Sequence, residues 1–339
     1  MGFKRLQASD FVVSADAVQS TAWSTNAPTL TSFFTSSVQQ AGSSGAYYLS
    51  VYQTASGVAG AAVQFDIAYG NVKGSGSAYF NSTFPQFTPS STTYGQYRTM
   101  ILEDENTNFT YGDGTNTFSP DDFWVISIDR ARYKESIFPG SFNITLSGSG
   151  GDFGQINLTD NSNSTQIQTF LGSSRVYQLV SGSNGTAVGT SGFVPGSGSY
   201  GLVFPELGTI LLNPAAINQS IGVIPNRTAN LNNGTNQLTL FNSIVLGSSF
   251  TLNSQETITS DYVFVRAGNS EFNYSSNPSF ISGSTGELVS QTFINNPQVY
   301  MTTVGMYNDA NECIAVAKLS RPLLKDFTKE SLVRVKLDF

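Results

Sequence analysis

Residues 124–146 are the stretch that most limits how this chain can fold. The stretch opens with the apolar run WVISI, places five charged residues among the seven positions 129–135, turns at a Pro-Gly pair and ends with apolar residues alternating over 142–146. Apolar runs and alternation of apolar with polar residues are typical of β-strands. Charged residues make up only 12% of the chain, against about 25% in an ordinary globular protein. We therefore expect a central strand pair here, whose charged end specifies contacts in an assembly.

The overall composition favours β-structure. Gly, Ser, Thr and Asn are abundant, and the 339 residues include 25 Phe and 15 Tyr. Aromatic and β-branched side chains suit a pleated sheet, and Gly and Asn tolerate the positive φ angles of tight turns. We expect a mainly β protein with one or two β-sandwich or barrel-like domains, long Gly/Ser/Asn-rich loops and few short helices.

Four segments can be distinguished along the chain. Residues 1–45 carry little charge and no clear period, which predicts an N-terminal arm or a loosely wound entry segment, of a kind that can become ordered against a partner. Residues 46–150 are expected to form a β domain. Residues 151–298 are expected to form a second β domain or an elaboration of the first. Residues 299–339 are expected to form a C-terminal β-hairpin plus a terminal strand.

Four local patterns predict individual elements. Residues 94–102, YGQYRTMIL, are a strand candidate. An Asn-Pro-Ala-Ala sequence at 213–216 predicts a short helix with Asn as N-cap and Pro at its first position. Residues 300–307 and 313–319 flank an Asn/Asp-rich turn and predict a hairpin. Val, Val, Leu and Phe alternate with polar residues over 333–339, which predicts a half-buried last strand.

The residue inventory excludes several kinds of chemistry. Histidine is absent and Cys313 is the single cysteine, which rules out His-dependent triads, an intrachain disulfide and a cysteine zinc site. The sequence contains no G-x-x-x-x-G-K-[ST] loop for binding phosphates. Cys313 lies in an apolar run, so we expect a buried structural thiol. No cofactor, metal or catalytic residue is expected.

Carboxylate pairs are the remaining route to catalysis. Glycoside hydrolysis needs only two acids about 5–9.5 Å apart, and Asp121, Asp122, Asp129 and Glu135 lie near the predicted strand pair. An acidic chain offers such pairs by chance, however, and their separation cannot be read from the sequence. We therefore do not expect an enzyme, and keep a glycan-degrading activity as a minor alternative.

The charge balance and hydropathy indicate which partners to expect. The formal net charge of −7 is opposite to that of a nucleic-acid-binding protein. No segment reaches the ~18 consecutive apolar residues of a membrane span, and no apolar segment follows the basic residues at the N-terminus, as a secretory signal requires. We expect neither nucleic-acid binding nor membrane insertion, and synthesis in a cytoplasm.

Two clusters of charged residues are candidate interfaces. The first could form ion pairs between strands or subunits, and ion pairs inside its own fold are an equal alternative. The second could dock on an acidic neighbour, or could be a solvated edge that Lys and Arg protect from aggregation. The first cluster is Arg130, Arg132, Tyr133, Lys134 and Glu135, and the second is Lys325, Lys329, Arg334 and Lys336.

Several short phrases, scattered in order over most of the chain, resemble a known family. They are similar to phrases in structural tail and baseplate proteins of T4-like contractile-tailed phages, especially those that infect marine cyanobacteria. The phrases are IAYGN at 67–71 with GSGS at 74–77, YGQYR at 94–98, RARYKE at 130–135 with Pro139-Gly140, PELG at 205–208 with LNP at 212–214, YVFVR at 262–266 with FNYS at 272–275, VGMYND at 304–309, AVAKLS at 315–320 and KLDF at 336–339.

The resemblance implies a virion structural protein of the contractile-tail baseplate. Its partners would be other tail and baseplate proteins, and it would be present in several copies, with homo-oligomers among the expected states. The resemblance supplies no catalytic residue. An alternative from a different class is a fibre-type adhesin that binds a host-surface glycan or receptor through Tyr/Trp-containing and Asn/Gly-rich loops.

Overall fold

The computed structural model describes residues 3–36, 47–77, 83–84, 87–113, 117–148, 154–164, 169–189, 191–228, 235–283 and 285–338. The chain forms two compact units. We call Val18–Glu256 the central unit, and Met1–Ala17 with Thr257–Phe339 the terminal unit. Strands β1 (Phe11–Thr21) and β18 (Asn253–Ala267) contain the points at which the chain passes between the units. Each unit is described by itself.

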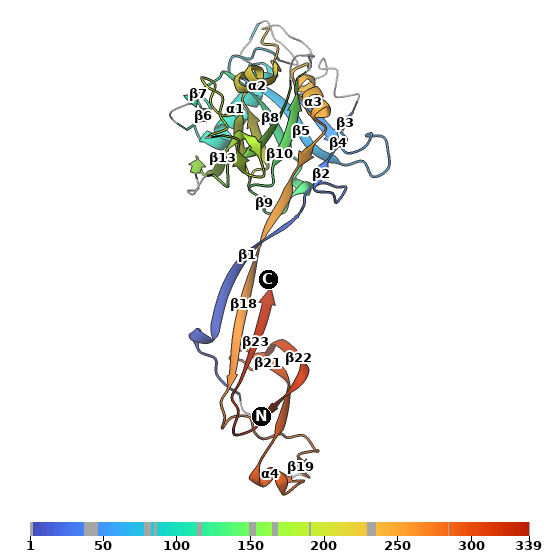
Figure 1. Cartoon of the computed structure of the whole chain (residues 1–339), viewed down its shortest axis with the longest axis vertical. Coiled ribbons are helices and arrows are strands. Elements are labelled where there is room, and N and C mark those ends of the chain that lie inside the picture. The colour runs from blue at the N-terminus through green and yellow to red at the C-terminus, as the bar shows by residue number, and fades with distance from the viewer. Residues whose placement is uncertain are drawn as a thin grey trace. The chain divides into compact units, whose positions relative to one another are not determined.

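One large antiparallel sheet dominates the central unit (Figure 1). The mainly β fold predicted from the composition is therefore confirmed. Two further short strands, β12 (Thr169–Leu171) and β14 (Thr186–Ala187), pair with β13. In spatial order the sheet contains β2 (Thr29–Leu30), β17 (Phe250–Thr251), β10 (Asn143–Ser147), β11 (Gln155–Asp160), β13 (Ser174–Ser183), β15 (Gly201–Phe204), β16 (Thr209–Leu212), β8 (Asp122–Ile128), β5 (Val63–Asn71), β4 (Tyr48–Tyr52) and β3 (Phe34–Thr35).

The large sheet curls around an aromatic core. Phe65 on β5 and Phe250 on β17 lie far apart in the strand order, yet their ring centroids are 5.3 Å apart. Trp23 closes the same cluster, because its indole Nε1 donates a hydrogen bond to Phe250 O at 2.9 Å. Segments 46–150 and 151–298 both supply strands to this sheet, so the part of 151–298 within the central unit elaborates one domain.

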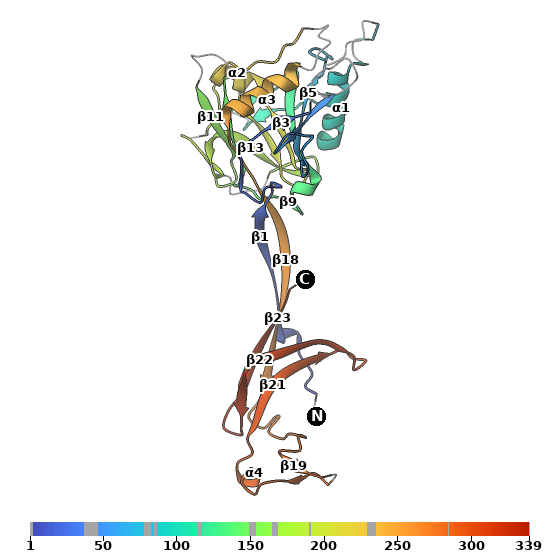
Figure 2. The same cartoon turned by 90° about the vertical axis from the view of Figure 1, so that its right-hand side faces the viewer.

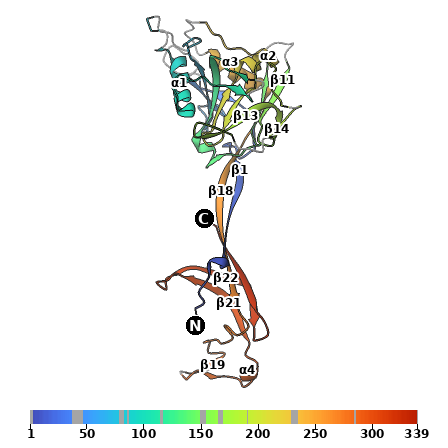
Figure 3. The ribbon, with the colours of Figure 1, turned by 90° about the vertical axis from the view of Figure 1, so that its left-hand side faces the viewer.

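Helices cover both faces of the sheet (Figures 2 and 3). Alternate residues of β8 show the two sides: Trp124 and Ile126 pack with α2 (Pro214–Ile221) and α3 (Thr235–Gly247). Phe123 and Val125 pack with α1 (Pro89–Leu102). Because both faces are covered, β8 reads as the continuous apolar run seen in the sequence.

The predicted pairing within residues 124–146 is wrong. Its apolar run lies in β8, which pairs with β5 and β16, whereas its alternating end lies in β10, which pairs with β11 and β17. Between them lie a short 3-10 helix (Arg130–Arg132), within the charged segment, and the two-residue strand β9 (Ser136–Ile137), which pairs with β18. This connection is too long and irregular for a hairpin, so the two strands do not pair with each other.

The strand predicted at 94–102 is also wrong, because these residues are the second part of α1. A proline opens the helix, where its missing N–H costs nothing. Ser90, Tyr94 and Ile101 are buried at helical spacing. The predicted strand began at Tyr94, so it left out the opening proline and the first buried residue of the helix. The aromatic residues that remained then favoured a strand.

The predicted helix at Asn213 is confirmed as α2. Asn213 is the N-cap, and its side-chain oxygen accepts a hydrogen bond from Ala215 N at 3.1 Å. Pro214 occupies the first helical position, and Gly222, in the left-handed conformation with φ 68°, ends the helix.

The terminal unit contains two packed β layers. One consists of β1, β18 and β23 (Ser331–Asp338), and the other is the hairpin of β21 (Val299–Tyr307) and β22 (Cys313–Lys325). The unit also contains β19 (Ile281–Ser282), β20 (Glu287–Leu288) and the four-residue α4 (Thr292–Asn295). Met306 on β21 and Val335 on β23 belong to one buried cluster, which packs the two layers together. The hairpin and last strand predicted from the sequence are confirmed, although Phe339 lies outside the described residues.

Cys313 is exposed, so the prediction of a buried thiol is wrong. Ala315 pairs with Met306 and Cys313 pairs with Tyr307, which leaves Ile314 as an extra residue in β22. Such a bulge interrupts the alternation of a strand. Cys313 therefore does not share the inward orientation of Ala315.

Candidate functional site

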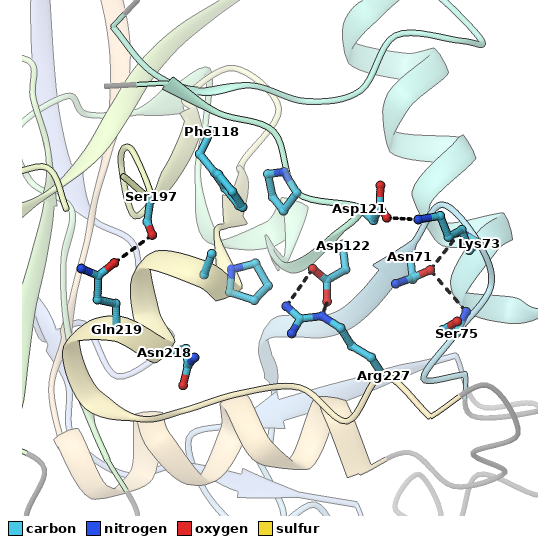
Figure 4. A pocket seen from close by; sticks show the side chains of 13 residues that line it. Asn71, Lys73, Ser75, Phe118, Asp121, Asp122, Ser197, Asn218, Gln219 and Arg227 are labelled. Carbon is cyan, nitrogen blue, oxygen red and sulfur yellow. Dashed lines mark hydrogen bonds and ion pairs between the residues drawn. The ribbon is translucent and has the colours of Figure 1, made fainter. Parts of the chain in front are cut away.

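The central unit contains an open cleft of about 600 Å³. It lies where β5 ends, β8 begins and α2 presents its surface (Figure 4). Ser197 and Arg227 approach it from two loops, and β7 (Thr117–Phe118) contributes an aromatic ring. Its lining consists of Asn71, Lys73, Ser75, Phe118, Pro120, Asp121, Asp122, Ser197, Pro214, Ala215, Asn218, Gln219 and Arg227.

The strand ends fix one wall of the cleft. Asn71, the last residue of β5, pairs with Asp122, the first residue of β8. The side-chain oxygen of Asn71 accepts hydrogen bonds from the backbone N–H groups of Lys73 at 2.9 Å and Ser75 at 3.3 Å. This Asn-centred turn holds the Lys73 side chain beside Asp121, with which it forms an ion pair.

Helix α2 forms the opposite wall. Asn218 and Gln219 are exposed on the helix surface, and Gln219 Oε1 accepts a hydrogen bond from Ser197 Oγ at 2.9 Å. Among the described residues, the Asn218 side chain has no hydrogen-bond partner (Figure 4). Its amide therefore offers a donor and an acceptor to the cleft.

A bidentate ion pair lies at the base of the cleft. Arg227 Nε donates to Asp122 Oδ2 at 2.7 Å and Arg227 Nη2 donates to Asp122 Oδ1 at 3.1 Å. The buried Tyr69 hydroxyl also donates to Asp122 Oδ2, at 2.8 Å. Burial, followed by the charge of Asp122, raises the pKa of Tyr69 far above its usual range. Burial alone would lower the pKa of Arg227, but the hydrogen bonds and charge of Asp122 raise it.

The charges of the cleft balance each other. Lys73 neutralises Asp121 and Arg227 neutralises Asp122, so neither of these two carboxylates, proposed above as possible acids, stands alone. The rest of the surface combines uncharged polar groups with the apolar faces of Phe118, Pro120 and Pro214. Such a surface can bind an uncharged ligand that has both hydroxyl groups and apolar faces.

The first predicted interface cluster makes contacts within the central unit. Arg130 Nη1 donates to Tyr133 O at 2.5 Å, and its guanidinium lies 4.7 Å from the centroid of the Tyr133 ring. Arg132 Nε is 3.9 Å from Asp129 Oδ1, and Lys134 forms an ion pair with Glu256. Glu135 is exposed, and its backbone N–H donates to Gln255 O at 3.1 Å. The prediction that this cluster contacts another subunit stays a prediction.

The Tyr133 ring packs closely against the backbone of Gly208, where only a glycine leaves room for it. It is buried, and a Cβ at Gly208 (φ +62°) would lie 2.5–2.7 Å from the Tyr133 ring atoms. Burial raises the pKa of Tyr133. The tyrosine therefore acts within the fold as a support for Arg130.

The second predicted cluster lies in the terminal unit, and its four residues do not form one surface. Lys325 is fully buried, so its place in a surface cluster is corrected: its ammonium donates to Asn269 O, Asn273 Oδ1 and Asp326 O at 2.8–2.9 Å. Lys329 is exposed and lies 3.6 Å from Asp326 Oδ2. Arg334 and Lys336 are brought together, because both lie over the ring of Tyr262.

Sequence reasoning missed the cleft as a site. It identified the cap of α2 and the Asp121-Asp122 pair, but Arg227 is 105 residues from Asp122 and no local pattern joins them. In the described part of the chain, no group of three or more Asp, Glu or Cys residues is placed to hold a metal ion. No helix among the described residues is long and apolar enough to span a membrane.

No protein-family model, curated protein or solved structure matches this chain.

Proposed function

We propose that this chain is a structural protein of a phage virion, built into the tail or baseplate in several copies, and that the terminal unit provides the main assembly contacts. The observation that carries this proposal is the unusual exposure of apolar side chains in the terminal unit. Its described part buries Val263, Ala267, Phe280, Val299, Met306 and Val335. Many large apolar side chains remain exposed, among them Phe3, Phe11, Val13, Tyr300, Tyr307, Ile314, Val316, Phe327 and Leu332.

The two faces of the β21–β22 hairpin differ in what covers them. On the inner face, Met306 is buried against Val263 and Val335, and smaller side chains surround this cluster. On the outer face, Phe3, Tyr307, Ile314 and Val316 are 72%, 48%, 65% and 64% exposed. We call these four residues the outer-face patch. Phe3 and Tyr307 are in edge-to-face contact, with ring centroids 5.4 Å apart.

The free energy gained by burying the outer-face patch indicates whether it can hold two copies together. Completing the burial of a large apolar side chain that is already partly covered is worth about 1–2 kcal/mol. Two copies that met through the outer-face patch would bury eight such side chains, roughly 8–16 kcal/mol, against an association cost of about 4–15 kcal/mol. The patch can therefore support reversible self-association, and a stable assembly needs further contacts. Exposed residues such as Tyr300 and Leu332 are available for them.

The assignment to a phage tail rests on the family resemblance of the sequence phrases. A mainly β chain whose terminal unit gains burial from its neighbours agrees with a role in assembly. The contact predicted at Arg130–Arg132 belongs to this proposal as well. Arg130 also makes contacts within the fold, with the backbone and ring of Tyr133. Lys134, whose side chain is 55% exposed, is therefore the more specific position at which to test this cluster.

The proposal is tested in particles of the phage that encodes the chain. Gradient-purified virions are expected to contain the chain in several copies, as measured by quantitative mass spectrometry. A double substitution of the patch, Ile314→Glu with Val316→Glu, is expected to prevent incorporation. The exposed Val188→Glu in the central unit serves as the control and is expected to be incorporated normally. Absence of the chain from purified particles would overturn the proposal.

The cleft favours a second candidate function, a fibre-type adhesin. Its balanced charges, the available Asn218 amide and the Phe118 ring fit a neutral saccharide, whose hydroxyls bond to amides and whose C–H face packs on an aromatic ring. Under this function, saturation-transfer NMR with neutral trisaccharides of glucose, galactose, mannose and N-acetylglucosamine is expected to show binding. Lack of any signal from these four probes would remove the adhesin candidate.

Matched variants make the adhesin test specific. Asn218→Ala and Phe118→Leu are expected to weaken saccharide binding at least about tenfold. Two exposed residues outside the cleft provide the controls, Asn106→Ala and Phe170→Leu, which are expected to leave binding unchanged. Equal effects of cleft and control variants would contradict binding in the cleft.

A further inference from the structure

The buried amine of Lys325 belongs neither to the outer-face patch nor to the cleft. Lys325 is the last residue of β22, and its side chain is completely buried. Its Nζ donates hydrogen bonds to Asn273 Oδ1 at 2.8 Å and to the backbone oxygens of Asn269 and Asp326 at 2.9 Å. Among the residues that the structure describes, Lys325 forms no ion pair. Burying an ammonium without a counter-ion is costly, so a reaction that removes this charge is favoured.

The side-chain amide of Asn273 is held against this amine. Asn273 is buried, and its Nδ2 donates to Asn269 O at 2.7 Å, which keeps Oδ1 turned towards Lys325. A carbonyl carbon lies only about 1.2 Å from its oxygen, so the hydrogen bond to Oδ1 also brings Lys325 Nζ close to Asn273 Cγ. A desolvated lysine amine is a nucleophile towards carbonyl carbon.

A carboxylate that can take a proton from Lys325 lies two residues before Asn273. Glu271 accepts hydrogen bonds from Lys4 Nζ at 2.7 Å and from Gly268 N at 2.8 Å. These bonds, followed by the charges of Lys4 and Lys325, lower the pKa of Glu271. The Glu271 carboxylate therefore interacts with the charge of Lys325 without forming an ion pair with it. A general base often reaches its proton only when the reacting groups move together.

We propose that Lys325 and Asn273 form an isopeptide bond, in which Lys325 Nζ is joined to Asn273 Cγ and ammonia is released. Glu271 takes one proton from the ammonium, which leaves an amine with a free electron pair. That pair forms the bond to Cγ while the carbonyl electrons move to Oδ1. A second proton passes from Nζ to Nδ2, the carbonyl re-forms and the Cγ–Nδ2 bond breaks. The departing ammonia takes the proton from Glu271 and leaves as ammonium.

The reaction is balanced without an oxidant, a metal or another reactant. One ammonium and one carboxamide become one secondary amide and one ammonium ion, which diffuses into the solvent. Free amines and amides react slowly, but groups held in the right geometry react as if at an effective concentration of about 10⁵–10⁸ M. The product is neutral, so the cost of burying the charge of Lys325 is removed as well.

The bond closes a long loop in the least regular part of the terminal unit. Asn273 and Lys325 are 52 residues apart, and the segment between them includes β19, β20 and α4, which have two, two and four residues. A cross-link of this kind stabilises a fold by restricting the unfolded chain. It concerns a single chain, so it stands or falls independently of the proposed assembly role.

Peptide mapping of the purified full chain by tandem mass spectrometry tests the bond. Trypsin does not cleave after an acylated lysine or before a proline, so the cross-linked chain should yield peptide 267–318 joined to peptide 319–329. The expected mass is the sum of the two less one ammonia molecule. If cleavage after Lys325 is complete even after prolonged incubation of the folded protein, the proposal is overturned. Loss of ammonia confined to peptide 267–318, as cyclisation of an asparagine would give, also overturns it.

Variants of the two partners identify the bonded atoms. Lys325→Met and Asn273→Ala are each expected to abolish the branched peptide. The matched controls are two exposed residues of the same unit, Lys329→Arg and Asn277→Ala, which are expected to retain it. Equal yields in the partner and control variants would overturn the proposal.

The proton acceptor is tested through the rate of cross-linking. Glu271→Gln is expected to slow formation of the branched peptide at least about 100-fold. Raising the pH deprotonates the amine without a base and is expected to restore part of this rate, whereas a variant that had only lost its local structure would stay unreacted at every pH. A wild-type rate in Glu271→Gln would overturn the role of Glu271 and leave the bond standing.

Discussion

The ring of Tyr307 lies over the backbone of Gly305 in strand β21. A Cβ at Gly305 would be 3.0 Å from Tyr307 Cε2 and 3.6 Å from its hydroxyl oxygen. Gly305 is also the register partner of Val316, so the tyrosine ring occupies the space beside Val316 that a side chain would otherwise fill. This relationship joins the residues of the outer-face patch into one surface and keeps that surface apolar.

The labelling rate of the Cys313 thiol should show whether the outer-face patch is covered by another copy. The thiol is exposed and pairs in register with Tyr307, so a contact through the outer-face patch should cover it. We expect maleimide labelling of Cys313 to be fast in dilute protein and to slow as protein concentration rises. In the Ile314→Glu/Val316→Glu variant the rate should not depend on concentration. Slow labelling at every concentration would contradict the exposed position of this thiol.

Replacing Gly70 even by alanine should destabilise the fold. A Cβ there would lie 2.9 Å from the Phe123 ring and 3.1 Å from Tyr94 N at the contact between β5 and α1. Gly70→Ala should therefore lower the free energy of unfolding by about 1–3 kcal/mol.

Gly95 provides the matched control for Gly70. It lies within α1, and a Cβ there would meet nothing within 4 Å. Gly95→Ala should raise the free energy of unfolding by about 0.5–1 kcal/mol. Urea unfolding followed by the fluorescence of the buried Trp23 and Trp124 measures both variants, and a change of the same sign in both would contradict the packing described at β5.

Asn213 has two separable roles. It caps α2, and its Nδ2 donates to Ser197 O at 2.7 Å and Ser199 O at 2.8 Å in the loop before β15. Asn213→Ser can keep the cap but loses the two donors. Asn213→Ala loses both, and its free energy of unfolding should fall by a further ~1 kcal/mol. Equal losses in the two variants, measured by urea unfolding, would show that the cap contributes nothing.

Local signals explain what the sequence could predict. The Asn-Pro pair at 213–214, the turn at 308–311 and the alternation at 333–338 each act within a few residues, and each predicted element is present in the structure. The β8 and β10 pairing could not be predicted, because strand partners are chosen by burial over the whole sheet. Tyr94 misled the strand prediction because the helix signal begins at Pro89, outside the window.

The cleft and the exposed thiol were missed for related physical reasons. Arg227 reaches Asp122 only because the sheet and α2 bring distant segments together. Cys313 is turned outward by an extra residue in its strand, and a bulge leaves no mark on the alternation of residue types. The charged cluster at 129–135 was identified correctly as a concentration of charge, but its contacts with Tyr133 and Glu256 depend on the folded chain.

Glu271 should confer pH dependence on the terminal unit. The hydrogen bond from Lys4 Nζ at 2.7 Å, followed by that from Gly268 N, lowers the pKa of Glu271 below its usual value. A lowered folded-state pKa means that the stabilisation is present above the unfolded-state pKa and is lost as pH falls through the folded-state pKa. Lys4→Met should raise the Glu271 pKa in an NMR titration, and Lys4→Arg should largely preserve it. An unchanged pKa in Lys4→Met would contradict the assigned cause.

The central claim is that this chain assembles with further copies of itself, and sedimentation equilibrium of the purified full-length wild type tests it most directly. The account predicts a mean mass that rises with concentration across the micromolar range, from one chain towards a whole-number multiple of it, and that the Ile314→Glu/Val316→Glu variant stays at the mass of one chain. A wild type that stays at the mass of one chain up to about 100 μM would contradict it.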